Sequence, residues 1–412
     1  MAAAVGGGRV LRGPCHRAAL PPDGPVRPEG GAGTVTRHPR HADGQAAGLG
    51  TAVKGGALLL LLLAFIAFPK VFTNPAVTNY GVLALIYVTA ATAWNIFSGN
   101  TGYISLGQAV FFGSGAYAMG IAARDWHLTG TTVFTTLPLC GAVGALIAIP
   151  FGLIALRVRR HTFIVITIAV FFIFQLMAFN LPFTGGSSGL ASPFLSWPAA
   201  GYNTPFYYIA LAYAAGSIAL AWLIRRSRFG LQLRAIRDDE DRARGLGVRA
   251  MRVKLSAFVI SGAITAMIGA VWFYYIEQVE PQTGFDPIFD LTLVLMAFFG
   301  GYGSIAGPVL GALLLEPLTL WLNTQPAFSG GSVSEILLGA VFLIVVLFMP
   351  RGIVPTGGEL ITRIRTRGRP AVVPAAPGGP PASQVPPAAS GSSSGSGPSV
   401  GSGPSVNSGG AR

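Results

Sequence analysis

Long apolar stretches, separated by short polar segments, recur along the middle of this 412-residue chain. They lie near residues 55–72, 79–97, 104–123, 133–156, 162–181, 204–224, 255–276, 288–299, 305–322 and 334–349. Most approach the roughly 20 residues that an α-helix needs to cross about 30 Å of hydrocarbon. The pattern therefore predicts an all-α integral membrane protein, a polytopic helical bundle with about eight to ten transmembrane helices.

Two of these stretches differ from ordinary spans. The stretch 104–123 contains Ser105, Gly107, Gln108 and further glycines. We expect it to pack within protein and not against lipid, since small residues let helices approach closely. The stretch 288–299 is short and runs directly into a Gly-Gly-Tyr-Gly sequence at 300–303. That pattern predicts a broken or re-entrant helix, which is tolerated only where protein or a water-filled cavity satisfies the backbone.

The two ends of the chain have a different composition. Residues 1–54 are rich in Gly, Pro, Ala and Arg, and residues 370–412 are rich in Pro, Ala, Gly and Ser. Such segments bury too little apolar surface to offset the entropy of ordering. We therefore predict a disordered basic tail at 1–54, a transmembrane domain at 55–350, and a tail at 351–412 that is disordered from about residue 370.

The charges are few and unevenly placed. Charged residues make up 10% of the chain, against about 25% in soluble domains. The net charge is +13. The basic residues gather in the two tails, the 157–160 turn and the 225–254 loop. If ten spans alternate from a cytoplasmic N-terminus, all basic residues except Lys70 and Arg124 lie on the cytoplasmic side.

The opposite side then collects acidic residues, namely Asp125, Glu277, Glu280, Asp286 and Glu335. This distribution predicts a multi-pass membrane protein with both termini in the cytoplasm. The excess of positive charge is thus interpreted as a topology signal, with no nucleic-acid partner expected.

Residues that carry catalysis or bind cofactors are not grouped in the sequence. Cys15 and Cys140 are far apart, and the five histidines are scattered. The sequence contains no GxxxxGK[ST] motif, so we expect no ATP binding through a P-loop of its own. The chain is therefore predicted not to be an enzyme, with no metal site and no cofactor.

The loop 225–254 contains ten of the basic residues. Within it, residues 235–248 are predicted to form one short helix. Asp238–Arg242 and Glu240–Arg244 are spaced i,i+4 with the acid first, the more favourable order on a helix.

Gly245 and Gly247 supply a stop for this helix. Ile236, Ala243 and Leu246 share one narrow face. Spacing alone leaves two interpretations open: a helix that docks into a groove of a partner, or a solvated helix held at the membrane surface by its arginines.

Three segments resemble one known family. Residues 235–262, AIRDDEDRARGLGVRAMRVKLSAFVISG, resemble the cytoplasmic coupling loop of branched-chain amino acid ABC transporter permeases of the LivM type. Residues 98–118, SGNTGYISLGQAVFFGSGAYA, and 299–315, FGGYGSIAGPVLGALLL, resemble two further family segments in the same order. The resemblance covers about residues 75–350. The chain departs from the family pattern around Ala243, where Asp241, Arg242 and Arg244 replace small apolar residues and an acid.

The resemblance implies the permease subunit of an ABC importer for branched-chain amino acids, working by alternating access. It implies a place in the bacterial inner membrane and, as partners, ABC ATP-binding subunits, a second permease subunit of the LivH type and an extracytoplasmic solute-binding protein. Membrane lipid is a further partner expected from the apolar spans. It assigns contact with the ATPase to Arg237, Asp238, Asp239, Glu240, Ala243 and Gly247. The residues that we expect to line the translocation path are Gly102, Ser105, Gly107, Gln108, Gly300, Gly301, Gly303 and Ser304. The alternative for these glycines is that they serve only close helix packing.

Other functions stay open at this point. Related permeases carry urea or short amides, and the three motifs do not separate them. An ion-coupled secondary transporter would need ionisable residues inside the bundle, for which Glu316 and Asp290 are the candidates. A membrane scaffold would use the basic tails to bind anionic lipid.

Overall fold

The computed structural model describes residues 60, 62–72, 74–128, 130–192 and 201–325, with single positions between 336 and 356. The predicted tail 1–54, Glu335, and most of the predicted span 334–349 and tail 351–412 lie outside the described residues. The chain divides into two compact units, Met1–Thr73 and Asn74–Arg412. The described part of the first unit includes an apolar helix, Leu62–Val71.

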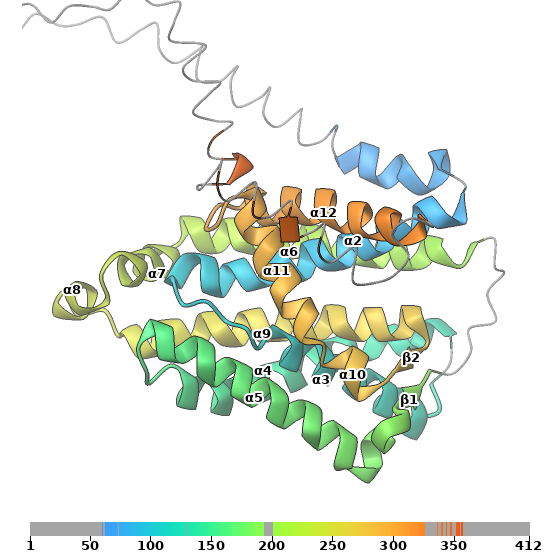
Figure 1. Cartoon of the computed structure of the whole chain (residues 1–412), viewed down its shortest axis with the longest axis horizontal. Coiled ribbons are helices and arrows are strands. Elements are labelled where there is room, and N and C mark those ends of the chain that lie inside the picture. The colour runs from blue at the N-terminus through green and yellow to red at the C-terminus, as the bar shows by residue number, and fades with distance from the viewer. Residues whose placement is uncertain are drawn as a thin grey trace, which may run out of the picture. The chain divides into compact units, whose positions relative to one another are not determined.

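The described part of the second unit is built almost entirely from helices (Figure 1). Its elements are α2 (Pro75–Trp94), the π-helical turn η1 (Asn95–Gly99), α3 (Gln108–Asp125), η2 (Gly130–Thr136), α4 (Leu137–Ala155), α5 (Arg160–Asn180), η3 (Pro182–Thr184), η4 (Gly186–Ser188), β1 (Leu190–Ala191), α6 (Asn203–Arg226), α7 (Arg228–Asp238), α8 (Glu240–Gly245), α9 (Ala250–Ile276), β2 (Gln278–Val279), α10 (Pro281–Gly284), α11 (Pro287–Gly300) and α12 (Ala306–Thr324). The two short strands pair antiparallel, with Leu190 opposite Val279. Among the described residues, seven helices are long and apolar enough to cross a membrane. The prediction of a polytopic all-α membrane protein is confirmed.

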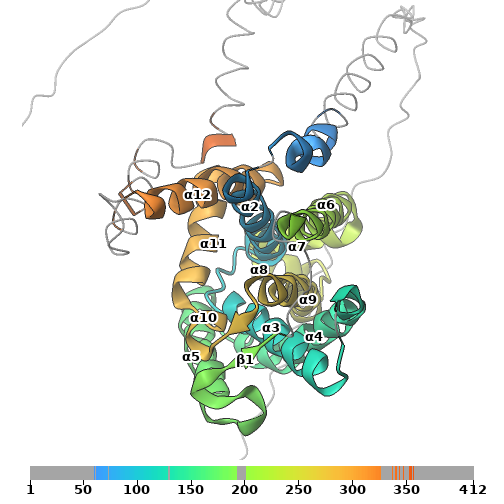
Figure 2. The same cartoon turned by 90° about the vertical axis from the view of Figure 1, so that its right-hand side faces the viewer.

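Helix α9 lies at the centre of the bundle, with α2 and α6 on one side and α3 and α4 on the other (Figure 2). Glycines allow its close approach to α3. A Cβ atom on Gly115 would lie 1.9 Å from the carbonyl oxygen of Ala266, and one on Gly269 would lie 2.2 Å from that of Phe112. Fourteen of the eighteen residues of α3 are buried, so the prediction that 104–123 packs within protein is confirmed.

The helical structure is interrupted between α11 and α12, as the Gly-Gly-Tyr-Gly sequence predicts. Gly301 and Gly303 have φ values of 126° and 76°, a region that residues with a side chain seldom adopt. A Cβ atom on Gly300 would lie 1.7 Å from the carbonyl oxygen of Gly307. The break therefore brings the end of α11 into backbone contact with the start of α12.

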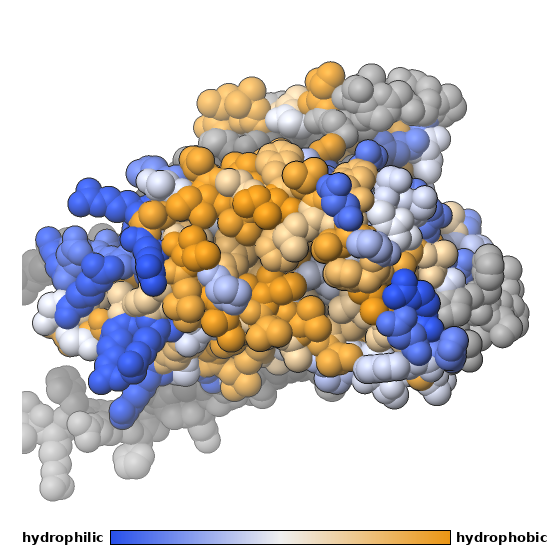
Figure 3. Space-filling model, turned by 90° about the horizontal axis from the view of Figure 1, so that it is seen from below, coloured by the Kyte–Doolittle hydropathy of each residue, from blue (hydrophilic) through white to orange (hydrophobic). Residues whose placement is uncertain are grey.

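The surface over α4 and α5 is largely apolar between two hydrophilic ends (Figure 3). Leu146 on α4 and Val165 on α5 are 69% and 65% exposed. Such exposed apolar side chains are unfavourable on a surface that faces water, whereas they are favourable on a surface that faces the hydrocarbon of a membrane. One hydrophilic end carries α7 and α8, and we call it the loop end. Helix α9 starts there and ends at Ile276, at the opposite end of the bundle.

Candidate coupling site and translocation path

The 225–254 loop folds into two helices, not one. α7 ends at Asp238, and Asp239, with φ −156° and ψ 109°, starts α8. The Asp239 carboxylate accepts hydrogen bonds from the amides of Asp241 and Arg242, each at 3.0 Å. The prediction of one helix over 235–248 is therefore wrong, because an aspartate that caps the following turn begins a new helix. The predicted stop is confirmed, since α8 ends at Gly245.

The division also changes the ion pairs. Glu240 pairs with Arg244, as predicted. Arg242 does not pair with Asp238 but with Asp239, at 2.9 Å between Nε and Oδ2. The predicted pair is lost because Asp238 belongs to α7, and the i,i+4 geometry holds only within one helix.

The apolar face predicted for this segment is split. Ile236 and Ala243 are buried in this chain, at 0% and 2% exposure, whereas Leu246 is 86% exposed. Asp238 and Gly247 are exposed as well. Two members of the predicted face therefore hold the loop onto its own bundle, and Leu246, Asp238 and Gly247 present the outer surface of α7 and α8.

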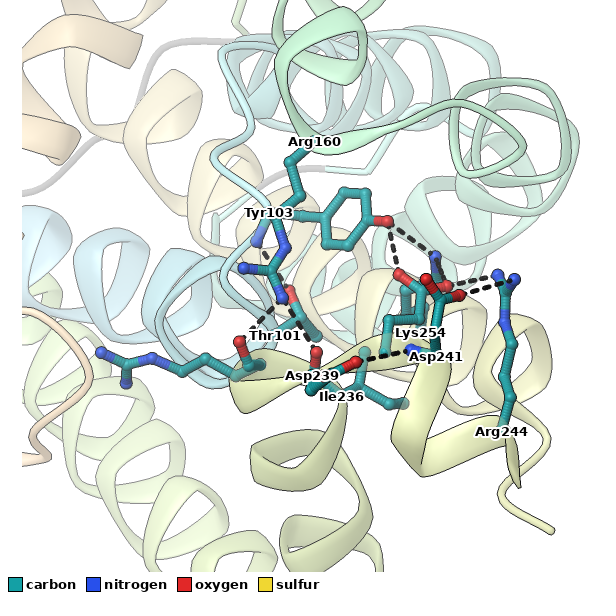
Figure 4. A network of polar contacts seen from close by, with 10 residues as sticks. Thr101, Tyr103, Arg160, Ile236, Asp239, Asp241, Arg244 and Lys254 are labelled. Atoms are coloured by element: carbon teal, nitrogen blue, oxygen red, sulfur yellow. Dashed lines mark hydrogen bonds and ion pairs between the residues drawn. The ribbon is translucent and has the colours of Figure 1, made fainter. Parts of the chain in front are cut away.

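Tyr103 and Lys254 belong to a polar cluster at the loop end (Figure 4), and both contact the carboxylate of Glu240. The Tyr103 hydroxyl donates to Glu240 Oε2 at 2.6 Å, and Lys254 Nζ donates to Oε1 at 2.8 Å. Lys254 Nζ also donates to the Tyr103 oxygen at 3.1 Å. Lys254 is 1% exposed, and a buried charge needs such partners. The cluster joins α8 to the start of α9 and to the segment that leads into α3.

The electrostatics of Glu240 keep it ionised. Burial raises the pKa of its carboxyl group, but hydrogen bonds from Lys254 and Tyr103 and the charges of Lys254 and Arg244 outweigh this. The pKa of Glu240 therefore lies below its ordinary value. Glu240 therefore keeps the negative charge on which its contacts with Lys254 and Tyr103 depend.

Arg237 connects the loop to the two glycine-rich segments, residues 98–118 and 299–315. Its Nη1 donates to the carbonyl oxygen of Gly99 at 2.8 Å, and its guanidinium lies over the Tyr302 ring, 4.7 Å from the centroid. The Tyr302 hydroxyl donates to the carbonyl oxygen of Ser98 at 2.8 Å. A Cβ atom on Gly303 would lie 2.1 Å from Arg237 Nη1, so Gly303 makes room for the arginine.

Arg160, at the start of α5, holds the end of α7. Its Nη2 donates to the carbonyl oxygens of Ile236 and Arg237 at 2.9 and 2.7 Å (Figure 4). These carbonyls belong to the last turn of a helix, where a cation is favourable. We call Tyr103, Arg160, Arg237, Glu240 and Lys254 the coupling network.

The two glycine-rich segments are also bonded directly to each other through Asn95, in the π-helical turn η1. Asn95 Nδ2 donates to the carbonyl oxygen of Ser304 at 2.7 Å, and Asn95 Oδ1 accepts from the amide of Gly303 at 3.1 Å. Single π-helical turns recur at functional sites. The sequence analysis did not single out Asn95, and nothing in its immediate sequence marks it.

The residues predicted for the translocation path fall into two groups. Gly102, Gly300, Gly301, Gly303 and Ser304 lie at the loop end with the coupling network. In the second group are Ser105, Gly107 and Gln108, all buried where α3 begins.

Gln108 is the most constrained of this second group. Its Nε2 donates to the hydroxyls of Ser261 and Thr265 on α9, at 2.8 and 2.6 Å. Its Oε1 has no hydrogen-bond partner among the described residues. These contacts tie the start of α3 to α9, while the role of the whole set in a path stays a prediction.

Asp290 on α11 caps the start of α3. Its Oδ1 accepts from the amide of Ala109 at 2.9 Å, and the residue is 3% exposed. Gly107, which precedes the helix, offers no side chain for this task. Asp290 thus joins α11 to the start of α3.

Glu316 is the other ionisable candidate inside the bundle. It lies on α12 and is 6% exposed.

Comparison with known proteins agrees with this architecture. Residues 76–346 match the family described as "Branched-chain amino acid transport system / permease component". The high-affinity branched-chain amino acid transport system permease protein LivM of Salmonella typhimurium is 26% identical over 327 residues, 72% of this chain and 74% of the relative. LivM of Escherichia coli is 25% identical over the same shares.

A shorter similarity points to another permease. The autoinducer 2 import system permease protein LsrC of Yersinia pestis is 33% identical over 137 residues, 32% of this chain and 38% of the relative. No solved structure matches the chain. The family match spans most of the second unit, including the coupling network and both glycine-rich segments. The chain belongs to the family of branched-chain amino acid transport system permease components.

Proposed function

We propose that this chain is a pore-forming permease subunit of an ABC importer for branched-chain amino acids in the bacterial inner membrane. The observation that carries the proposal is the contact of Arg237 with both glycine-rich segments at once. A loop that is only solvated at the membrane surface has no need of such contacts. The LivM relatives support the choice of solute.

We assign two tasks to the loop residues according to their exposure. Asp238, Gly247 and Leu246 face outward and form the surface that an ATP-binding subunit contacts. Arg237 and Glu240 face inward and carry a displacement of α7 and α8 to the bundle. Of the three departures, Asp241 and Arg242 are exposed and alter the charge of the outer surface, whereas Arg244 pairs with Glu240.

Alternating access then follows from the connections of the coupling network. When the ATP-binding subunits close, α7 and α8 move together with Arg237 and Glu240. Arg237 shifts the segments around Gly99 and Gly303, and Glu240 shifts Tyr103 at the entrance to α3. Small displacements at such a packed junction change which end of the bundle is open.

Two partners complete the proposed importer: a second permease of the LivH type and a solute-binding protein outside the membrane. An importer for autoinducer 2 is the alternative that the LsrC similarity suggests, and urea or short amides are alternatives within the same transport mechanism. The proposed topology, with the loop end and both termini in the cytoplasm, is the one in which the basic loop meets the ATP-binding subunits.

The decisive experiment is reconstitution in proteoliposomes. Leucine uptake should require ATP, the ATP-binding subunits, the second permease and the binding protein together. Uptake that follows an ion gradient with this chain alone would overturn the proposal. Uptake of autoinducer 2 or urea without uptake of leucine would keep the transport mechanism and overturn the solute.

A further inference from the structure

A cavity of about 430 Å³ lies between α3, α4 and α5. Its walls are mainly apolar, with Val143 and Ile147 from α4, Phe174 and Met177 from α5, and Phe285 beyond α10. Small-molecule pockets typically measure about 300–1,000 Å³ and are lined mainly by hydrophobic side chains with a few polar groups. The cavity therefore has the size and the lining of a site for a small, largely apolar solute.

Tyr117 supplies a polar group in this wall. It lines the cavity and is 4% exposed, and its ring stacks on Phe285 with centroids 5.7 Å apart. The Tyr117 hydroxyl has no hydrogen-bond partner within the described part of the chain. The hydroxyl oxygen is itself enclosed, so a solute reaches it only if the Tyr117 side chain turns toward the cavity. A buried hydroxyl without a partner costs stability, so the missing hydrogen bond favours that turn once a solute is bound.

Charges of both signs lie at one side of the cavity. Asp125 is one of its lining residues, and Arg124 donates to Asp125 at 2.8 Å and to the carbonyl oxygen of Phe183, another lining residue, at 3.3 Å. Asp125 and Arg124 are about half exposed. They lie at the last turn of α3, where the negative end of the helix dipole also favours a cation. An ammonium group suits Asp125, and a carboxylate suits Arg124.

The cavity and the coupling network lie at opposite ends of α3. The network contacts the segment before Gln108, where α3 starts, and the cavity is lined by the second half of the helix up to Asp125. In the proposed topology the cavity lies toward the side from which the binding protein delivers solute. Helix α3 thus connects the place where solute arrives with the place where motion enters.

We propose that the α3–α5 cavity is a solute site of the permease itself, which takes a zwitterionic amino acid with a branched apolar side chain. Asp125 binds the ammonium group, Arg124 binds the carboxylate, and the side chain fills the space between Val143 and Phe174. This proposal rests on the proposed function, because it names the place within the bundle that receives the amino acid.

The test compares leucine with the smaller valine in proteoliposomes that contain the complete importer, with each amino acid saturating the binding protein. Val143→Phe places a ring in the cavity, so the ratio of leucine to valine uptake should fall about tenfold, since a pocket discriminates one methylene by about that factor or more. Leu146→Phe is the matched control, because Leu146 lies one turn away on α4, is 69% exposed and does not line the cavity. Its uptake ratio should equal that of the unmodified protein.

Tyr117→Phe separates solute binding from packing. Loss of one hydrogen bond should lower leucine uptake about fivefold. The melting temperature should stay the same or rise, because the variant removes an unpartnered hydroxyl. If Tyr117 had only a structural role, Tyr117→Phe would lower leucine uptake only together with the melting temperature.

Three results would overturn the site. One is an uptake ratio in Val143→Phe equal to that in Leu146→Phe, which is the result expected if a lipid chain fills the cavity. Another is a parallel loss of leucine and valine uptake in Val143→Phe. The third is unchanged leucine uptake in Tyr117→Phe. Failure of the proposed function is distinguishable, since the unmodified importer would then take up neither amino acid.

Discussion

The two ends of α3 lie in opposite kinds of surroundings. At the loop end, Lys254 and Glu240 form an ion pair with side chains 1% and 14% exposed, and Tyr103 completes the contacts. At the far end, Arg124 and Asp125 form an ion pair with side chains 48% and 51% exposed, beside a cavity. A buried, fully paired cluster holds one geometry, whereas an exposed pair exchanges partners at little cost. The first suits the transmission of force, and the second suits the reception of a solute.

The largest expected effect comes from removing the central charge of the loop end. Glu240→Ala leaves the buried Lys254 ammonium without its counter-charge, and breaking a buried pair in this way costs about 3–5 kcal/mol. We expect a marked fall in melting temperature of the purified protein and loss of ATP-driven uptake.

Asp241→Ala is the control for that change, because the Asp241 side chain is 95% exposed. It should leave the melting temperature nearly unchanged. Adding Lys254→Met to Glu240→Ala should recover much of the lost stability. A melting temperature that is equal in Glu240→Ala and Asp241→Ala would show that the loop end is no more rigid than the exposed pair at the other end.

A second prediction separates force transmission from stability. Arg237→Ala removes the hydrogen bond to Gly99 and the contact with Tyr302. ATP hydrolysis by the assembled importer should continue while leucine uptake falls about tenfold, a typical size for a coupling between distant sites.

Arg242→Ala serves as the matched control, since Arg242 belongs to the same loop and its side chain is 86% exposed. It should change the ratio of solute transported to ATP hydrolysed only slightly. Unaltered coupling in Arg237→Ala would refute the inward-facing role of Arg237. Exchanging the charges of Arg237 and Glu240 together should also uncouple the importer, because each residue has different partners.

Two glycines with positive φ provide a finer comparison. Gly303→Ala introduces both backbone strain and a collision with Arg237, since φ is 76° and the new Cβ would lie 2.1 Å from Nη1. Gly247→Ala at φ 87° meets no atom within 4 Å and carries only the backbone term. We expect losses of about 2–3 kcal/mol for the first and about 1 kcal/mol for the second.

The double variant Gly303→Ala with Arg237→Ala tests the cause. It should regain the part of the stability that the collision removes, although not the part due to backbone strain. Equal losses for the two single glycine variants would mean that Arg237 moves aside easily and exerts little force on the 299–304 segment.

The sequence was sufficient for the bundle and for the position of the loop, but not for the contacts within it. Runs of apolar residues and the break at 300–303 follow from local composition. The division of the loop at Asp239 does not, because an aspartate is favourable both in the first turn of a helix and at its N-cap. The predicted Asp238–Arg242 pair failed for that reason.

Contacts between residues far apart in the sequence could not be predicted either. Arg160 contacts α7 across 76 residues, and Asn95 contacts Ser304 across 209. The pattern of apolar and polar positions along the chain does not indicate such pairs. Tyr103 and Lys254 lie inside two of the segments that resemble the family, yet only the structure shows that both contact Glu240.

The smallest expected effect concerns acidity and the same carboxylate. The pKa of Glu240 is lower in the folded protein than the value of about 4.3 for an unfolded chain. Its contribution to stability is therefore present above about pH 4.3 and is lost as the pH falls through the lower pKa of the folded state. Glu240→Gln lacks this ionisation, so the difference in melting temperature between the unmodified protein and this variant should shrink as the pH is lowered below about 4.3. A difference that stays constant down to pH 3 would contradict the depressed pKa, and with it the claim that the paired carboxylate makes the loop end stiffer than the cavity end.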